Sequence, residues 1–237
     1  MRHLPKAVLF DFGNTLFLES AFNADAGNKY LLENNNNPYN ISFDQIKNKV
    51  EHFKPYIQKS RETSLLEHSW TAFTKLVYEP FGMNVTDQIN EIGFWEAALK
   101  CSLAPGIVDF LNTLKSMNIK SGIVSNNAFN AKTLEYELNK NGLLEYFEFV
   151  ISSADYGIRK PHPFLFEVAI QKTGCECKDI WFIGDSIDND FYGSKKVGMV
   201  PFLYSNSNSE KYIEENNISS WYVIDKLIKE IGSNVLA

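Results

Sequence analysis

The sequence predicts an α/β fold: a Rossmann-like parallel sheet core with an inserted α-helical cap domain. Three observations support this prediction. A short apolar strand occupies residues 7–10, helical periodicity without clear strands covers residues 17–100, and strands alternate with helices from residue 104 onward. Such alternation is typical of a parallel sheet covered by helices. Because the helical block separates the first strand from the others, we expect a cap of residues 17–100 on a core of residues 1–16 and 101–237.

The first strand runs directly into the carboxylate of Asp11. A short apolar run bounded by turn residues is typical of a strand that is buried on both faces of a parallel sheet. Asp11 would then lie at the carboxyl end of this strand, where open α/β sheets bind their ligands. A helix N-cap or an Asx turn would also explain this aspartate, so the strand alone does not define a site.

The inserted block shows helix start signals at regular intervals. Ser42 and Gln45 form a capping-box pattern, and Ser69 and Thr86 each precede a further apolar stripe of helical spacing. Three aromatic side chains at helical spacing are predicted to form the core of the cap, with a lining role in a substrate pocket as the open alternative: Trp70, Phe94 and Trp95.

Five more strands are predicted after the cap, at residues 120–126, 147–153, 180–185, 199–204 and 221–224. The intervening helices include residues 108–117, 131–143 and 163–173, the last of which begins with a proline, where the missing N–H costs nothing. The asparagine-rich stretches at 34–37 and 206–208 are expected to be surface loops.

Composition excludes several partners. The chain of 237 residues has a net charge of −6 and a pI near 5.3, which argues against nucleic acid or an anionic membrane as its main partner. No stretch is apolar for long enough to cross a bilayer. Cys101, Cys175 and Cys177 lack the spacing of a zinc site or a disulfide framework. We therefore expect reduced thiols and a cytoplasmic location.

Polar side chains flank or follow the predicted strands at four places. The residues are Asp11, Ser125, Asn126, Lys160, Asp185 and Asp190. Because the carboxyl ends of parallel strands meet at one edge of the sheet, we expect these side chains to share one crevice. Clustered carboxylates raise one another's pKa, and a lysine and a divalent cation would relieve that repulsion. An all-oxygen cluster with few protein ligands suits Mg²⁺, which usually meets substrate phosphate.

The order of these residues is specific in combination. The chain contains Asp11-x-x-x-Thr15, then Ser125-Asn126, then Lys160-Pro161, and last Gly184-Asp185-Ser186-x-x-Asn189-Asp190. In this order the motifs resemble those of the haloacid dehalogenase superfamily, in the branch whose helical cap is inserted after the first motif. The resemblance extends over nearly the whole chain, although in the cap it rests on position alone.

The resemblance implies a phosphatase that forms an aspartyl-phosphate intermediate on Asp11, the nucleophile. Thr15 would orient the Asp11 carboxylate. Ser125 would hydrogen-bond the phosphoryl group with help from Asn126, and Lys160 would neutralise both the nucleophile and the transferring group.

The same resemblance implies Mg²⁺ as the cofactor. Asp11, the backbone carbonyl of Gly13 and Asp185 would ligate the metal. Asp190 would ligate it directly, or fix a metal-bound water or Lys160. The implied partner is a small phosphorylated metabolite, and we expect a monomer or homodimer that binds neither nucleic acid nor membrane.

The chain departs from the pattern at Gly13. Phosphatases of the superfamily usually have a second aspartate there as general acid and base, a role worth about 10²–10⁴-fold in rate. A good leaving group needs little protonation, whereas a simple alkoxide needs much more. Glu19, His52 and His68 of the cap are the candidate replacements.

Three alternatives to a phosphatase follow from that departure. A dehalogenase would need an arginine in the first cap segment, and none lies between Arg2 and Arg61. A phosphonate hydrolase would need a cap lysine in an apolar setting, which the sequence does not provide at its four candidates: Lys29, Lys47, Lys49 and Lys54. A catalytically weak protein that binds a phosphorylated ligand is the third alternative.

Overall fold

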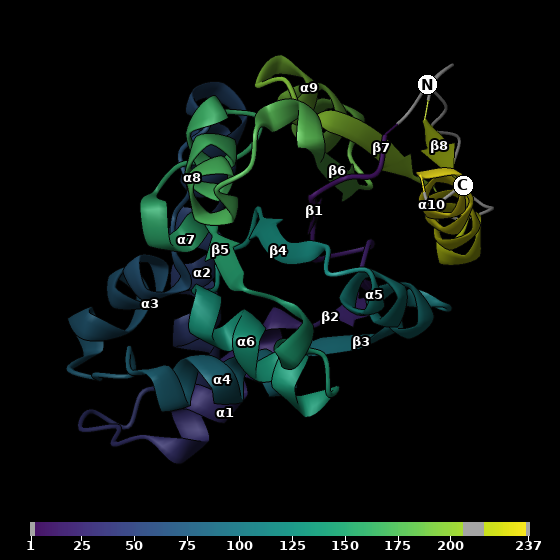
Figure 1. Cartoon of the computed structure of the whole chain (residues 1–237). Coiled ribbons are helices and arrows are strands. Elements are labelled where there is room, and N and C mark those ends of the chain that lie inside the picture. Colours follow the sequence, from purple (N-terminus) through teal and green to yellow (C-terminus); the bar gives the residue numbers. More distant parts are fainter. Residues whose placement is uncertain (1–2, 206–215, 236–237) are drawn as a thin grey trace.

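The core is a single six-stranded sheet, seen in the computed structural model, which describes residues 3–205 and 216–235 (Figure 1). The strand order is β5-β4-β1-β6-β7-β8, and each neighbouring pair is parallel. The strands are β1 (Ala7–Phe10), β4 (Lys120–Ser125), β5 (Phe149–Ser152), β6 (Ile180–Gly184), β7 (Val200–Tyr204) and β8 (Asn217–Ile218). The predicted α/β class is therefore confirmed.

Strand β1 lies in the middle of the sheet and is buried on both faces. Val8 and Phe10 belong to one apolar cluster and Ala7 and Leu9 to the other, as the alternation of side chains along a strand requires. The first cluster includes side chains of α5 (Ile107–Ser116), α6 (Ala131–Lys140) and α10 (Trp221–Val235), and the second those of α8 (Pro163–Thr173). Helices thus cover both faces of the sheet (Figure 1), and Asp11 directly follows the carboxyl end of β1.

Short helical turns complete the core and the connections. They are η1 (Glu79–Phe81), η2 (Leu144–Tyr146), α7 (Ser153–Tyr156), η3 (Cys177–Asp179), η4 (Ile187–Tyr192) and α9 (Gly193–Lys196). Cys101, Cys175 and Cys177 are free thiols. No helix among the described residues is long and apolar enough to span a membrane.

The inserted segment is mainly helical, with α1 (Ala24–Asn34), α2 (Phe43–Ser64), α3 (Trp70–Tyr78) and α4 (Gln88–Ala98). The predicted capping box is present: Gln45 N–H donates to Ser42 Oγ at 3.4 Å, and Ser42 N–H donates to Gln45 Oε1 at 2.9 Å. The start of α4 differs from the prediction by one residue, because the cap is Asp87 and not Thr86. The Asp87 carboxylate accepts from Asn90 N–H at 3.0 Å.

The prediction that residues 17–100 contain no strand is wrong at both ends of that segment. Strand β2 (Phe17–Phe22) pairs antiparallel with β3 (Leu99–Leu103), where the chain leaves the core and returns to it side by side. Most of β2 is exposed, so that strand lacks the apolar alternation that marks a half-buried strand. Strand β3 does alternate, with Leu99, Cys101 and Leu103 half-buried, but it is only five residues long. The register shifts at Ser20, an extra residue of the kind that bends a strand and re-aims its neighbours.

The predicted strand at residues 221–224 is also wrong, since these residues begin helix α10. Trp221, Ile224 and Ile228 are buried at helical spacing, whereas Tyr222 and Val223 are exposed. The aromatic and β-branched residues of this stretch suggested a strand, but burial follows the helical period. The predicted loop at 206–208 lies outside the described residues.

The inserted segment also contacts the core away from the β2–β3 ribbon. Leu66, between α2 and α3, forms an antiparallel bridge with Ile158. Glu67 N–H donates to Gly157 O at 2.9 Å, and Arg159 N–H donates to Leu65 O at 2.9 Å. The cap is therefore hydrogen-bonded to the loop that immediately precedes Lys160.

Candidate active site

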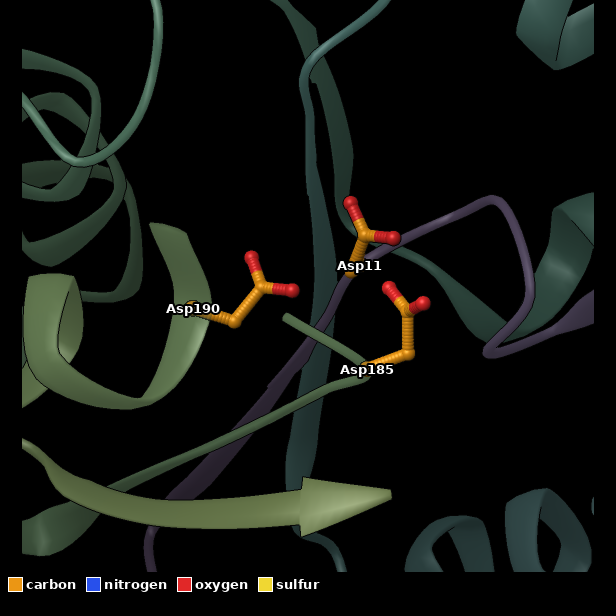
Figure 2. Close-up of side chains that lie close together, drawn as sticks. All are labelled: Asp11, Asp185 and Asp190. Carbon is orange, nitrogen blue, oxygen red and sulfur yellow. The ribbon is translucent and has the colours of Figure 1, made fainter. Parts of the chain in front are cut away.

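Three predicted site carboxylates meet at the carboxyl ends of neighbouring strands. Asp11 follows β1, Asp185 follows β6, and Asp190 lies in η4. Figure 2 shows their side chains pointing toward one another. Each offers an oxygen, and these oxygens all lie within 4.8 Å of one another. The structure thus brings together residues that are up to 179 positions apart in the sequence.

Lys160 lies among these carboxylates and is 1% exposed. Its Nζ donates to Asp11 Oδ1, to Asp190 Oδ1 and to the carbonyl oxygen of Val124, each at 2.7 Å. All three ammonium protons therefore have an acceptor. The lysine is held in one position, between the predicted nucleophile and Asp190.

The charges of the site shift the pKa values of its groups. Burial raises the pKa of Asp11 to about 7; Lys160 opposes this effect, while Asp190 and Asp185 add to it. Burial alone would lower the pKa of Lys160, but its attraction to Asp11 and Asp190 outweighs burial and raises that pKa. Three carboxylates beside one ammonium give the site an excess of negative charge, which repels a dianionic phosphate. A bound cation would offset this repulsion.

The three carboxylates fit Mg²⁺ as a group. An octahedral Mg²⁺ binds oxygens at about 2.0–2.1 Å, so that its ligands lie about 3–4 Å from one another. The spacing of the oxygens of Asp11, Asp185 and Asp190, within 4.8 Å, is close to that range. No cysteine or histidine belongs to the cluster, and an all-oxygen donor set favours a hard cation.

Asp190 already has protein partners for both carboxylate oxygens. Oδ1 accepts from Lys160, and Oδ2 accepts from Ser186 N–H at 3.0 Å. A Cβ on Gly184 would lie only 2.4 Å from Asp190 Oδ2, so the absence of a side chain at residue 184 makes room for this arrangement. Among the predicted roles of Asp190, these contacts favour the positioning of Lys160.

Asn126 also holds Lys160. Its Nδ2 donates to Lys160 O at 2.9 Å, and its Oδ1 accepts from Lys160 N–H at 2.7 Å. Ser125 and Asn126 both line the cavity in front of Asp11. The contacts of Ser125 and Asn126 with a phosphoryl group stay predictions. The pair of hydrogen bonds with Lys160 explains why Asn126 lies beside that residue.

The predicted role of Thr15, to orient the Asp11 carboxylate, is not supported by a hydrogen bond between the two side chains. Thr15 is fully buried, and its Oγ1 has no hydrogen-bond partner among the described residues. The chain turns sharply after Asp11: Asn14 has a positive φ of 52°, and Leu16 N–H and Phe17 N–H both donate to Phe12 O, at 3.1 and 3.2 Å. Thr15 lies inside this turn, and Asp11 is bonded by Lys160 instead.

Glu19 enters the site from strand β2. It lines the cavity of about 370 Å³ that also contains Asp11, Gly13 and Lys160, which we call the site cavity. Its Oε1 lies only 2.8 Å from where a Cβ on Gly13 would be. The pKa of Glu19 is raised because the cavity walls desolvate its carboxylate and because Asp185 repels a negative charge.

The other two candidate proton donors lie elsewhere. His52 is exposed on α2, and His68 lines a separate cavity of the cap. The structure thus leaves Glu19 as the one of the three that reaches the site cavity. The sequence signal for Glu19 was only its nearness to the first motif.

Two further cavities lie next to the site cavity, in the direction of the cap. A cavity of about 240 Å³, which we call the neck, shares Glu19 and Arg159 with the site cavity and Phe22 and Arg61 with a cavity of about 590 Å³, the cap chamber. In the sequence Arg61 only ends an arginine-free stretch, whereas in the structure it lines the neck. The argument against a dehalogenase from missing arginines therefore loses its force.

Glu67 fixes both arginines of the neck. Its side chain is fully buried, and its carboxylate forms ion pairs with Arg61, at 2.7 Å, and with Arg159. Ser153 Oγ donates to Glu67 Oε2 at 2.9 Å. A buried carboxylate with these partners holds the two guanidinium groups in place beside the neck.

Comparison with known proteins defines the family. Residues 8–203 match the family model of haloacid dehalogenase-like hydrolases, and the chain belongs to this family, as the motif order predicted. Its parallel six-stranded sheet and its site at the strand ends agree with this assignment. The protein is therefore a hydrolase.

Three similar proteins illustrate the range of the family. A glyceraldehyde 3-phosphate phosphatase of Methanocaldococcus jannaschii is 26% identical over 198 residues, which is 82% of each chain. The pyrimidine 5'-nucleotidase YjjG of Escherichia coli is 29% identical over 113 residues, 47% of this chain and 49% of that protein. The structure of a HAD phosphatase from Thermococcus onnurineus aligns with a TM-score of 0.65 and 25% identity, covering 94% of this chain and 97% of that one.

Proposed function

We propose that this hydrolase is a Mg²⁺-dependent phosphatase of a small phosphorylated metabolite, with Asp11 as the nucleophile. The observation that supports this proposal most directly is the arrangement of Asp11, Asp185 and Asp190, whose oxygens lie within 4.8 Å of one another, while Lys160 Nζ donates to Asp11 and to Asp190. Such a site offers a carboxylate that can attack phosphorus and, next to it, the ammonium of Lys160. The negative charge that remains would be neutralised by a bound metal ion. The curated relatives named as phosphatases support the same reaction class.

The residues divide the work of phosphoryl transfer. An Asp11 oxygen attacks phosphorus, the bond to the leaving oxygen breaks, and water then attacks the aspartyl phosphate and releases inorganic phosphate. Lys160 stays bonded to Asp11 and offsets the charge of the transferring group, and Ser125 hydrogen-bonds that group. Bound Mg²⁺, held by Asp11, the Gly13 carbonyl and Asp185, would neutralise the phosphoryl oxygens.

Glu19 takes the role of proton donor, which Gly13 cannot fill because it has no side chain. Its carboxylate occupies the space beside Gly13, in the same cavity as Asp11. Its raised pKa keeps Glu19 protonated to a higher pH than an isolated glutamate, as a general acid requires. Glu19 would protonate the leaving oxygen in the first step and accept a proton from the attacking water in the second.

Phosphate release with and without metal tests the proposal. We expect activity on phosphate monoesters that disappears with a chelator and returns with added Mg²⁺. The set of test substrates should also include a haloacid and a phosphonate. The haloacid is needed because Arg61, which lines the neck, is an arginine of the kind that a dehalogenase requires. Halide release that is independent of Mg²⁺, with no phosphate release from any monoester, would overturn the proposal. Binding of phosphorylated ligands without turnover would identify a catalytically weak binding protein.

Replacement of Glu19 by Gln tests the proton donor. With glycerol 3-phosphate, whose leaving group is a basic alkoxide, kcat/KM should fall about 10²-fold, the lower end of general-acid effects. With p-nitrophenyl phosphate the loss should be small, because that leaving group needs no proton. The measurement is the dependence of kcat/KM on leaving-group pKa, which should steepen in Glu19→Gln. Equal losses on both substrates would show that Glu19 has another role.

A second substitution provides the matched control. Gly13→Asp places a carboxylate close to the position of the Glu19 carboxylate, since a Cβ on residue 13 would lie 2.8 Å from Glu19 Oε1. The contact is with the flexible end of a side chain, and it is absent when Glu19 is shortened to Ala. The double variant Glu19→Ala/Gly13→Asp should therefore recover alkyl monoester turnover relative to Glu19→Ala alone. Failure to recover would separate the two positions functionally.

A further inference from the structure

The cap chamber is larger and less polar than the site cavity. Its volume is about 590 Å³, against about 370 Å³ for the site cavity, and the neck of about 240 Å³ lies between them. Ligand pockets are typically about 300–1,000 Å³ and bury most of their ligand. A three-carbon phosphate in the site cavity would leave both the neck and the chamber unused.

One wall of the chamber is aromatic. Phe22, Trp70, Phe94 and Phe129 line it and contact one another, with ring centroids 5.7 Å apart for Trp70–Phe94 and 6.2 Å for Trp70–Phe129. Trp70, Phe94 and Phe129 are otherwise buried, so they form part of the cap core and of the chamber at once. Phe22 is 52% exposed and lines both chamber and neck, where a second ring can stack on it.

Polar groups also line the chamber. Helix α2 contributes Lys54, Gln58 and Arg61, spaced so that they share one face of the helix, together with the apolar Val50 and Ile57. His68 also lines the chamber, and its Nε2 is buried without a hydrogen-bond partner among the described residues. A chamber that has both aromatic side chains and hydrogen-bonding groups in its lining suits a flat ring with apolar faces and polar edges.

The neck joins the chamber to the phosphate end through polar groups. Glu19, Arg159 and Asn126 line both the neck and the site cavity. Hydroxyl groups of a linker could hydrogen-bond there. The succession of a charged cavity, a polar neck and an aromatic chamber corresponds to the succession of phosphate, sugar and base.

We propose that the substrate is a nucleoside monophosphate, whose phosphate binds at Asp11 while its base stacks in the cap chamber beside Phe22. This inference rests on the proposed phosphatase function, and it specifies that the leaving group is a nucleoside. The aromatic wall recognises any flat heteroaromatic ring, since every base has a π face. The groups of α2 and His68 then bind the edge of the base.

Kinetics on matched substrates test this assignment. The kcat/KM for 5'-UMP and 5'-AMP should exceed that for glycerol 3-phosphate and glyceraldehyde 3-phosphate, measured as phosphate release in the presence of Mg²⁺. In Phe22→Ala the ratio of nucleotide to glycerol 3-phosphate should fall about 5- to 100-fold, the loss expected for one stacking contact. Tyr56→Ala, which removes a 66% exposed ring of α2 outside the chamber lining, should leave this ratio unchanged.

The outcomes separate this inference from the proposed function. Equal or better turnover of the three-carbon phosphates, or an unchanged ratio in Phe22→Ala, overturns the nucleotide assignment while the phosphatase function stands. If no monoester is hydrolysed, the phosphatase function fails, and binding of uridine and adenosine to the wild type then decides about the chamber. Quenching of tryptophan fluorescence by the nucleosides, lost in Phe22→Ala, supports the chamber as a base site, and the absence of any binding overturns it.

Discussion

Asp11→Asn is expected to lower turnover of every phosphate monoester by at least about 10⁴-fold, the scale of loss for a removed nucleophile. The substitution keeps the shape of the side chain but removes the attacking oxygen's charge. Lys160 can still donate to the amide oxygen of the substituted side chain in place of Asp11 Oδ1, so the packing around the 1% exposed lysine should persist. The measurement is phosphate release at saturating Mg²⁺, with circular dichroism as the check on folding.

The covalent step has its own readout. Acid-quenched wild-type enzyme should contain a peptide with Asp11 that is heavier by one phosphoryl group, and beryllium fluoride should bind at the same carboxylate as a mimic of the acyl phosphate. Neither signal should occur in Asp11→Asn. Asp109→Asn, at an exposed aspartate of α5, is the matched control and should behave as wild type. A phosphoryl group found on any other residue would disprove the role of Asp11.

The parts of the site that were predictable from sequence are those tied to strand ends. Asp11, Ser125 and Asp185 each follow or end an apolar strand, and in a parallel sheet that placement alone brings them to one edge. Lys160 was found through its motif, but its three hydrogen bonds and its support by Asn126 depend on the folded loop. Burial and hydrogen-bond partners of this kind leave no trace in local sequence.

The sequence named Glu19 as one of three candidate proton donors, but the choice among them, like the cap chamber, could not be predicted, for a different reason. Glu19 reaches the site because β2 pairs with β3, some 80 residues further along the chain, and because the register shifts at Ser20. The chamber wall joins Phe22, Trp70 and Phe129 from three distant segments. Helical spacing correctly placed Trp70 in the cap core, but a pocket wall formed between segments has no periodicity of its own.

Asp185 offers a test in which stability and activity should change in opposite directions. Its carboxylate lies in a cluster with Asp11 and Asp190, where it repels the charge of Asp11 and raises the pKa of that group. Removal of one of these like charges should stabilise the metal-free protein by about 1 kcal/mol, or about 2–4 °C in Tm for a chain of this size. Asp185→Asn removes the charge with little change in volume.

The same substitution should remove the response to metal. A cation that binds only the folded state stabilises that state, so the Tm of the wild type should rise with Mg²⁺ concentration. In Asp185→Asn this rise should be absent, and Mg²⁺-dependent turnover should be lost with it. Asp188→Asn, at an exposed residue three positions further on and outside the carboxylate cluster, should retain both the rise in Tm and the turnover. A normal Mg²⁺ titration in Asp185→Asn would show that the cation binds without this carboxylate, and the metal site would then have to be assigned to other residues.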